Sequence, residues 1–200
     1  SCREFDSLPG HQFLIHPLFF LADRRGVAST MMAVSHAMTG LVAWAVTAYH
    51  TDFSLTPLTA GVAVIASLVP DIDHPDSWIG RRLFIIAYPL SLLIKHRGVT
   101  HSLLMVATLA ALASIYTNPA SLWPAPWAAA FVVGYCVHLL GDAITAKGIP
   151  LLWPWKRSFA LPPGIRTGSL LEIVLVVGFV AGAVFVYAEP IQGLVDCCLY

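Results

Sequence analysis

The sequence predicts an all-α fold: a polytopic membrane helical bundle of about five spans plus a short re-entrant or interfacial helix. Hydrophobic residues make up 58% of the 200 residues and charged residues only 11%, whereas a soluble domain carries about 25% charged residues. The mean hydropathy is +0.76. The apolar residues also gather in stretches that approach the roughly 20 residues needed to cross a bilayer.

Five apolar stretches are the candidate spans, at residues 31–49, 55–69, 102–116, 123–144 and 170–188. The second and third are short for a span. A sixth run, 83–94, has twelve residues and contains Pro89, so we expect a re-entrant or interfacial helix there. The regular pattern starts near residue 31. We therefore divide the chain into an N-terminal extension or arm (1–30), one membrane domain (31–190) and a C-terminal tail (191–200).

The basic residues predict the orientation of the bundle. With five spans, all eleven fall on one side of the membrane: Arg3, Arg24, Arg25, Arg81, Arg82, Lys95, Arg97, Lys147, Lys156, Arg157 and Arg166. Short loops rich in Lys and Arg stay in the cytoplasm. We therefore place the N-terminus and the loops 70–101 and 145–169 in the cytoplasm. Eleven acidic residues balance the eleven basic ones, so the partner we expect is the lipid bilayer and not nucleic acid.

Histidine and aspartate residues gather at the predicted cytoplasmic ends of the spans. Seven of them are candidate metal ligands: His36, Asp71, Asp73, His74, His101, His138 and Asp142. His138 and Asp142 are four residues apart and share one helix face. An unpaired carboxylate within an apolar helix costs several kcal/mol. Asp142 therefore needs a partner, and a divalent cation is one that neutralises several carboxylates at once.

The loop donors have spacings that suit the same ion. Asp71 and His74 are three residues apart, in a segment that prolines bracket at both ends. Thr100 is a candidate N-cap that would place His101 in the first turn of the third span. One zinc ion takes about four ligands, so seven donors indicate one or two divalent ions. Imidazole and carboxylate without thiolate favour zinc, with manganese or iron as alternatives.

Other interpretations of these residues stay open. His138 and Asp142 could form a helix–helix hydrogen bond, and the segment from Asp71 to His74 could be a solvated turn. His36 could be an interfacial residue.

Asp73 and three further residues, His96, Arg97 and Glu172, are candidates for the chemistry beside the metal. Asp73 or His96 could act as a general base, and Arg97 could bind an anionic group or simply follow the positive-inside rule. Glu172 could complete the site or cap its helix.

At these residues the sequence resembles the YdjM-like family of LexA-regulated, membrane-bound metal-dependent hydrolases of bacteria. The matching stretches are SH at 35–36, LVPDIDHPDS at 68–77, HRGVTHS at 96–102, GYCVH at 134–138, DAIT at 142–145 and GIPLLWP at 148–154. The resemblance covers roughly residues 31–161, in order. It weakens near Glu172 and does not include the first 30 residues. It implies a bacterial inner-membrane protein with a hydrolytic metal site.

The family is also distantly similar to zinc-dependent phospholipases C, which are helical enzymes with His and Asp ligands on several helices. That likeness implies a phosphoesterase, with ligands at His36, Asp71, His74, His101, His138 and Asp142. The expected function is hydrolysis of a lipid or lipid-linked phosphate at the cytoplasmic face. The alternatives are a metal-ion or proton transporter and a non-catalytic membrane protein that a metal stabilises.

Overall fold

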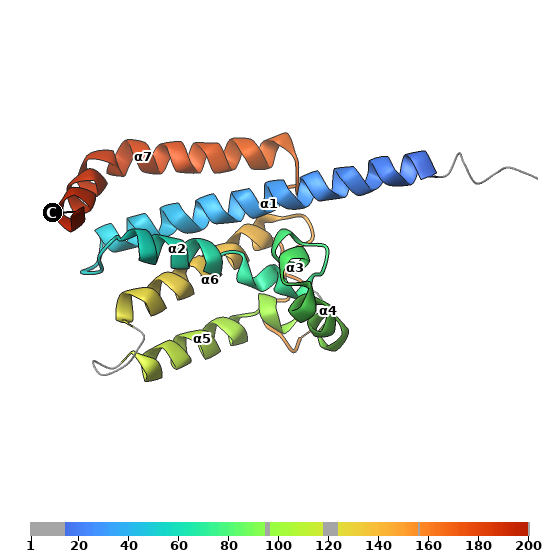
Figure 1. Cartoon of the computed structure of the whole chain (residues 1–200), viewed down its shortest axis with the longest axis horizontal. Coiled ribbons are helices and arrows are strands. Elements are labelled where there is room, and N and C mark those ends of the chain that lie inside the picture. The colour runs from blue at the N-terminus through green and yellow to red at the C-terminus, as the bar shows by residue number, and fades with distance from the viewer. Residues whose placement is uncertain (1–14, 95–96, 118–123, 156, 200) are drawn as a thin grey trace, which may run out of the picture.

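The computed structural model describes residues 15–94, 97–117, 124–155 and 157–199, and it is all-helical over these residues (Figure 1). The predicted all-α fold class is confirmed. The elements in order are α1 (Ile15–Tyr49), α2 (Pro57–Ala66), η1 (Val69–Asp73), α3 (Trp78–Arg82), α4 (Phe84–Leu93), η2 (Val99–His101), α5 (Leu103–Tyr116), α6 (Ala125–Ile144) and α7 (Leu170–Leu199). The elements η1 and η2 are short 3₁₀ helices.

The first and last helices are longer than the sequence pattern predicts. Helix α1 begins at Ile15, well before residue 31, and α7 continues to Leu199. Pro17 falls in the first turn of α1, where the missing N–H costs no helical hydrogen bond. The predicted arm and tail are therefore partly helical, and the division of the chain into 1–30, 31–190 and 191–200 stays a prediction.

Two helices in the described part of the chain are long and apolar enough to cross a membrane, at Ala125–Ile144 and Leu170–Tyr187. Helices α2 and α5 have 10 and 14 residues. At about 1.5 Å per residue they reach roughly 15 and 21 Å, less than the hydrocarbon core of about 30 Å. The segment predicted as a short non-spanning helix is α4, which has 10 residues and Pro89 inside it. The count of five spans stays a prediction.

Helices α1, α2 and α6 pack closely because small residues line their contacts. A Cβ atom at Gly134 of α6 would lie 2.2 Å from the carbonyl oxygen of Ala63 in α2, so only glycine permits this approach. On the α1 side, the fully buried Trp44 donates from Nε1 to Thr59 Oγ1 at 3.0 Å. These contacts fix the end of α2, and with it the polar segment that follows.

The connections at one end of the bundle bring distant segments together. Figure 1 shows η1, α3, α4, η2 and the loop between α6 and α7 at the same end of the molecule, together with the N-terminal half of α1. The loop returns to α6 through hydrogen bonds from Leu161 N to Ala143 O, at 2.7 Å, and from Ile165 N to Ile144 O, at 2.9 Å. The basic loops and the predicted site therefore share one end of the bundle.

Candidate metal centre

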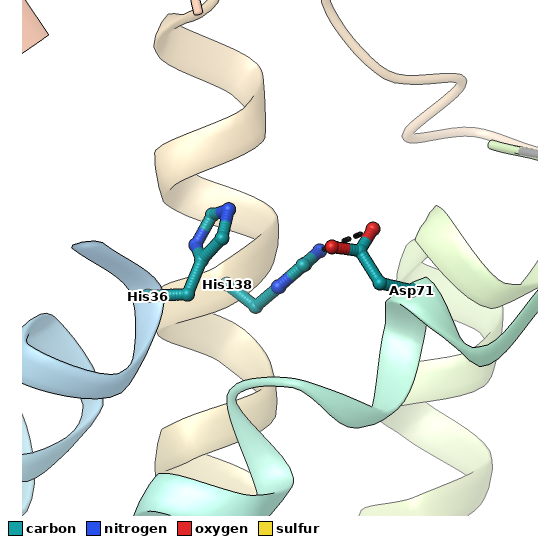
Figure 2. A group of neighbouring side chains, drawn as sticks. All are labelled: His36, Asp71 and His138. Carbon is teal, nitrogen blue, oxygen red and sulfur yellow. Dashed lines mark ion pairs between the residues drawn. The ribbon is translucent and has the colours of Figure 1, made fainter. Parts of the chain in front are cut away.

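Five of the seven predicted ligands meet at this end of the bundle. They come from four elements: His36 from α1, Asp71 from η1, His101 from η2, and His138 and Asp142 from α6. His101 and His138 are 0% exposed and Asp142 is 1% exposed. Figure 2 shows the His138 ring facing the Asp71 carboxylate, with His36 on the neighbouring helix. Polar groups this deeply buried need partners.

The ligating atoms are spaced as around one small ion. His138 Nε2 lies 3.3 Å from His101 Nε2, and Asp142 Oδ2 lies 3.5 Å from His101 Nε2 and 4.0 Å from His138 Nε2. Asp71 Oδ1 is 3.8 Å from His101 Nε2 and 3.7 Å from His138 Nε2. At metal–ligand distances of about 2.0–2.2 Å, two ligands of a tetrahedral site lie roughly 3.3–3.6 Å apart. The four atoms are close to that spacing.

A second group of donors shares His138. The ligating atoms of His36, Asp71 and His138 lie within 4.8 Å of one another, as do those of His101, His138 and Asp142. The rings of His36 and His138 stack with their centroids 4.1 Å apart. His36 approaches α6 at Gly141, where a Cβ atom would lie 3.1 Å from His36 Cε1. The donor atoms therefore suffice for one ion. The two groups overlap because both contain His138.

Hydrogen bonds behind the two central imidazoles orient them toward the cluster. His138 Nδ1 lies 2.7 Å from the carbonyl oxygen of Ser67, which can only accept, so Nδ1 carries the proton. Thr100 donates its hydroxyl proton to Asp73 Oδ2 at 2.5 Å, so it accepts from His101 Nδ1 at 3.0 Å. Both Nε2 atoms are then acceptors that face the carboxylates. Such outer hydrogen bonds fix the tautomer of metal-binding histidines.

Asp142 is the most unusual residue of the cluster. Neither of its carboxylate oxygens accepts a hydrogen bond within the described part of the chain, although both are buried. Arg97 Nη2 lies 3.0 Å from Oδ2, in an ion pair whose geometry does not make a hydrogen bond. Two imidazole nitrogens and two carboxylates therefore converge as acceptors. A cation is what this donor set fits, in keeping with the nitrogen and oxygen ligands of zinc.

The surroundings of Asp71 favour its ionised form. Burial alone would raise the pKa of this carboxyl, but the neighbouring imidazoles of His101, His138 and His36 hold the pKa below its ordinary value. The carboxylate is the form that binds a metal ion.

The other predicted site residues lie around this cluster. Asp73 contacts Thr100, on the far side of the His101 ring from the converging atoms, 3.7 Å from its Nδ1. His74 Nδ1 accepts from Asp76 N at 3.1 Å, and His74 belongs to neither donor group. Glu172 Oε2 accepts from Gly168 N at 2.6 Å, which matches its capping alternative. His96 lies outside the described residues.

Arg97 connects the cluster to the loop after α6. Its Nη1 donates to Gly148 O at 3.0 Å and to Thr145 Oγ1 at 3.3 Å. Its backbone has a positive φ of 56°, which is uncommon outside glycine. The sequence left two roles open for Arg97, anion binding and a positive-inside charge, and the structure adds a third: Arg97 holds the 145–148 turn beside Asp142.

The roles of Ser67 and Thr100 in the outer hydrogen bonds could not be predicted from the sequence. Ser67 contributes only its backbone carbonyl, which no sequence signal marks. Thr100 was expected to cap α5, but that expectation is wrong: Ser102 caps α5, since its Oγ accepts from Met105 N. The hydroxyl of Thr100 is thereby left for Asp73 and His101.

Replacing Thr100 by valine is expected to weaken divalent metal binding by about 10–100-fold, the usual cost of losing an outer hydrogen bond to a ligand. Valine keeps the volume but removes the hydroxyl that orients His101. Titration against a zinc indicator measures the affinity. Thr100→Ser should bind nearly as the wild type, and Thr108→Val on the exposed face of α5 is the matched control. Unchanged affinity in Thr100→Val would exclude this role.

The sequence matches the profile of the YdjM inner membrane protein family over residues 31–199. The chain belongs to the YdjM family. All five converging donors lie inside the matched region, which extends beyond residue 161, where the resemblance was expected to end. Membership of this family makes the protein a bacterial inner-membrane protein.

Three relatives in the YdjM comparison illustrate the range of the similarity. The inner membrane protein YdjM of Escherichia coli (strain K12) is 41% identical over 129 residues, which cover 63% of this chain and 62% of that protein. The protein of that name from Shigella flexneri gives the same values. Protein YvsG of Bacillus subtilis (strain 168) is 31% identical over 163 residues, 82% of this chain and 98% of that protein. No solved structure matches the chain significantly.

Proposed function

We propose that this YdjM-family protein is a membrane-bound, metal-dependent hydrolase, a phosphoesterase acting on a lipid or lipid-linked phosphate at the cytoplasmic face. One observation carries the proposal: four acceptor atoms, from the buried His101, His138 and Asp142 and the partly buried Asp71, converge at ligand spacing. The cytoplasmic orientation rests on the basic loops that share this end of the bundle (Figure 1).

The metal we propose is zinc, with manganese or iron as alternatives and one or two ions bound. His101, His138, Asp71 and Asp142 would hold the first ion, and His36 is the added donor of the overlapping group. Nitrogen and oxygen donors near tetrahedral spacing suit zinc. A bound divalent ion supplies Lewis-acid activation of water and neutralisation of charge on a phosphoryl group.

The protein's own groups would orient and stabilise the reacting phosphate. The Arg97 guanidinium lies 3.0 Å from Asp142 at the edge of the cluster, where it can stabilise negative charge that develops on phosphate oxygens. Asp73 is fully buried behind Thr100. Asp73 accepts the hydrogen bond of the Thr100 hydroxyl, which in turn accepts from His101 Nδ1. Asp73 therefore orients His101 through Thr100, and this positioning role suits it better than that of general base. His96 remains the other candidate base.

The decisive experiment measures metal and turnover in the same sample. The protein is purified in detergent, its metal content is determined, and phosphomonoesters and phosphodiesters are assayed with and without chelator. His101→Ala and Asp142→Ala should lose metal and turnover together. His50→Ala is the matched control, because His50 is exposed and contacts Tyr187, outside both donor groups.

Three other outcomes would replace the proposal. Bound metal without turnover of any phosphoester would indicate a metal-stabilised membrane protein. Metal-driven or proton-driven uptake into liposomes would indicate a transporter. A preparation that never binds metal would mean that protons on the imidazoles hold the cluster together, since protonated histidines would turn the same contacts into ion pairs.

A further inference from the structure

A cavity of about 390 Å³ adjoins the candidate metal centre, between α1, α6, α7 and the loop at 162–167. Its polar lining includes His36 and Asp142 of the centre, together with Glu172. The remaining lining is largely apolar, with Val137, Leu175, Val176 and Phe179 among it. Cavities of about 300–1,000 Å³ bind small molecules. This volume is continuous with the donor cluster and has polar groups that a simple packing gap lacks.

The titratable groups of the lining, His36, Asp142 and Glu172, lie nearer the end of the cavity that adjoins the basic loops, and mostly apolar residues line the rest. Along α6 the lining runs from Val137 to Thr145, and along α7 from Phe179 back to Glu172. At about 1.5 Å per residue these stretches span roughly 10–12 Å. Helices α1 and α7 lie side by side and α6 runs the opposite way (Figure 1). The cavity therefore extends along the helices, from the basic-loop end into the apolar middle of the bundle.

The apolar end opens on the surface of α7. Leu175 and Phe179 line the cavity and are still 44% and 48% exposed. The stretch Leu170–Tyr187 has the composition of a membrane span, so its exposed apolar side chains face lipid. A chain from the bilayer can then enter the cavity without crossing water.

We infer that this cavity binds the apolar chain of a long-chain phosphate ester, which enters from the bilayer along α7 with its phosphate at the His36 and Asp142 end. For the headgroup chemistry the inference rests on the proposed function. For the chain it rests on the apolar lining, the opening along α7 and the position of the donors at one end. Acyl and isoprenoid chains share this chemistry, and the experiment separates them.

The test uses a hexadecyl phosphate that carries a diazirine in its chain, with the full-length protein in phospholipid nanodiscs. After irradiation, mass spectrometry should locate the label on the cavity-facing residues of α1, α6 and α7. Val176→Trp fills the cavity and should reduce labelling at least about tenfold, since expelling two methylene groups already costs that much. Val177→Trp is the matched control, because Val177 is 59% exposed and does not line the cavity.

Folding of the variants is checked by circular dichroism and by thermal unfolding in the nanodiscs, neither of which depends on the proposed activity. Val176→Phe is a milder second variant that should give an intermediate loss. Competition by unlabelled hexadecyl phosphate or by a polyprenyl phosphate then identifies the preferred chain: the stronger competitor is the chain type that the cavity selects.

The outcomes separate this inference from the proposed function. Labelling of the cavity without turnover of any phosphoester would overturn the hydrolase and support the chain site. Labelling spread over the outward face of α7, equal in Val176→Trp and Val177→Trp, would overturn the chain site. Turnover of soluble phosphoesters together with such spread labelling would leave the hydrolase intact and remove only the chain site.

Discussion

Alanine in place of His138 is expected to abolish metal binding and with it all phosphoester turnover. His138 belongs to both donor groups, so its loss removes a ligand whichever way one or two ions bind. Loss of an outer hydrogen bond to a ligand costs about 10–100-fold in metal affinity or activity, and loss of the ligand itself should exceed that range. Metal analysis of the purified variant, together with a phosphoester assay, measures both effects.

His74→Ala is the informative comparison for His138→Ala. Both residues are histidines that the sequence predicts as ligands, but His74 Nδ1 bonds to Asp76 N and His74 lies in neither donor group. His74→Ala should therefore keep its metal. If His74→Ala lost metal while His138→Ala retained it, the donor set described here would be wrong.

The meeting of the donors could be predicted because charge and length constrain a membrane chain strongly. The positions of Lys and Arg predicted that the loops share one side, and alternating spans then place His36, His101 and His138 at one end. An aspartate in an apolar helix predicted that Asp142 needs a partner. Its carboxylate accepts no hydrogen bond in the described residues, but it forms an ion pair with Arg97 and faces the two central imidazoles.

Which of the three donors in the segment Asp71-Ile72-Asp73-His74 would take part could not be predicted. In a 3₁₀ helix each residue turns the chain by about 120°, so side chains two apart point in different directions. Asp71 and Asp73 therefore separate. Residues three apart would eclipse, but η1 ends at Asp73, and His74 adopts an extended conformation with φ −119° and ψ 108°. Pro75 marks where that helix stops, because the residue before a proline favours an extended conformation, but nothing in the sequence shows that the preceding segment is a 3₁₀ helix.

The sequence pattern also did not predict the start of α1. The hydrophobic period begins near residue 31, yet the helix begins at Ile15. Backbone hydrogen bonds propagate through polar residues as readily as through apolar ones once a helix is nucleated. A change of composition therefore predicts where burial changes, not where a helix ends.

Valine in place of Gly134 is expected to destabilise the bundle by about 1–3 kcal/mol or more, the cost of overpacking a well-packed contact. The new Cβ atom would lie 2.2 Å from Ala63 O and 3.0 Å from Ala63 C. These are backbone atoms of α2 and cannot rotate away. Helices α2 and α6 must then separate, and thermal unfolding in detergent should show a lower Tm.

The same separation should reach the metal centre without a change in any ligand. Ser67 follows directly on α2 and its carbonyl accepts from His138 Nδ1 of α6 at 2.7 Å, so parting the helices breaks the hydrogen bond that orients His138. We therefore expect Gly134→Val to lose metal affinity as well as stability. Gly61→Val is the matched control, since a Cβ atom at Gly61 of α2 meets nothing within 4 Å. A Gly134→Val protein with a lowered Tm but wild-type metal affinity would show that the Ser67 carbonyl does not orient the ligand, because α2 would have moved while the site stayed intact.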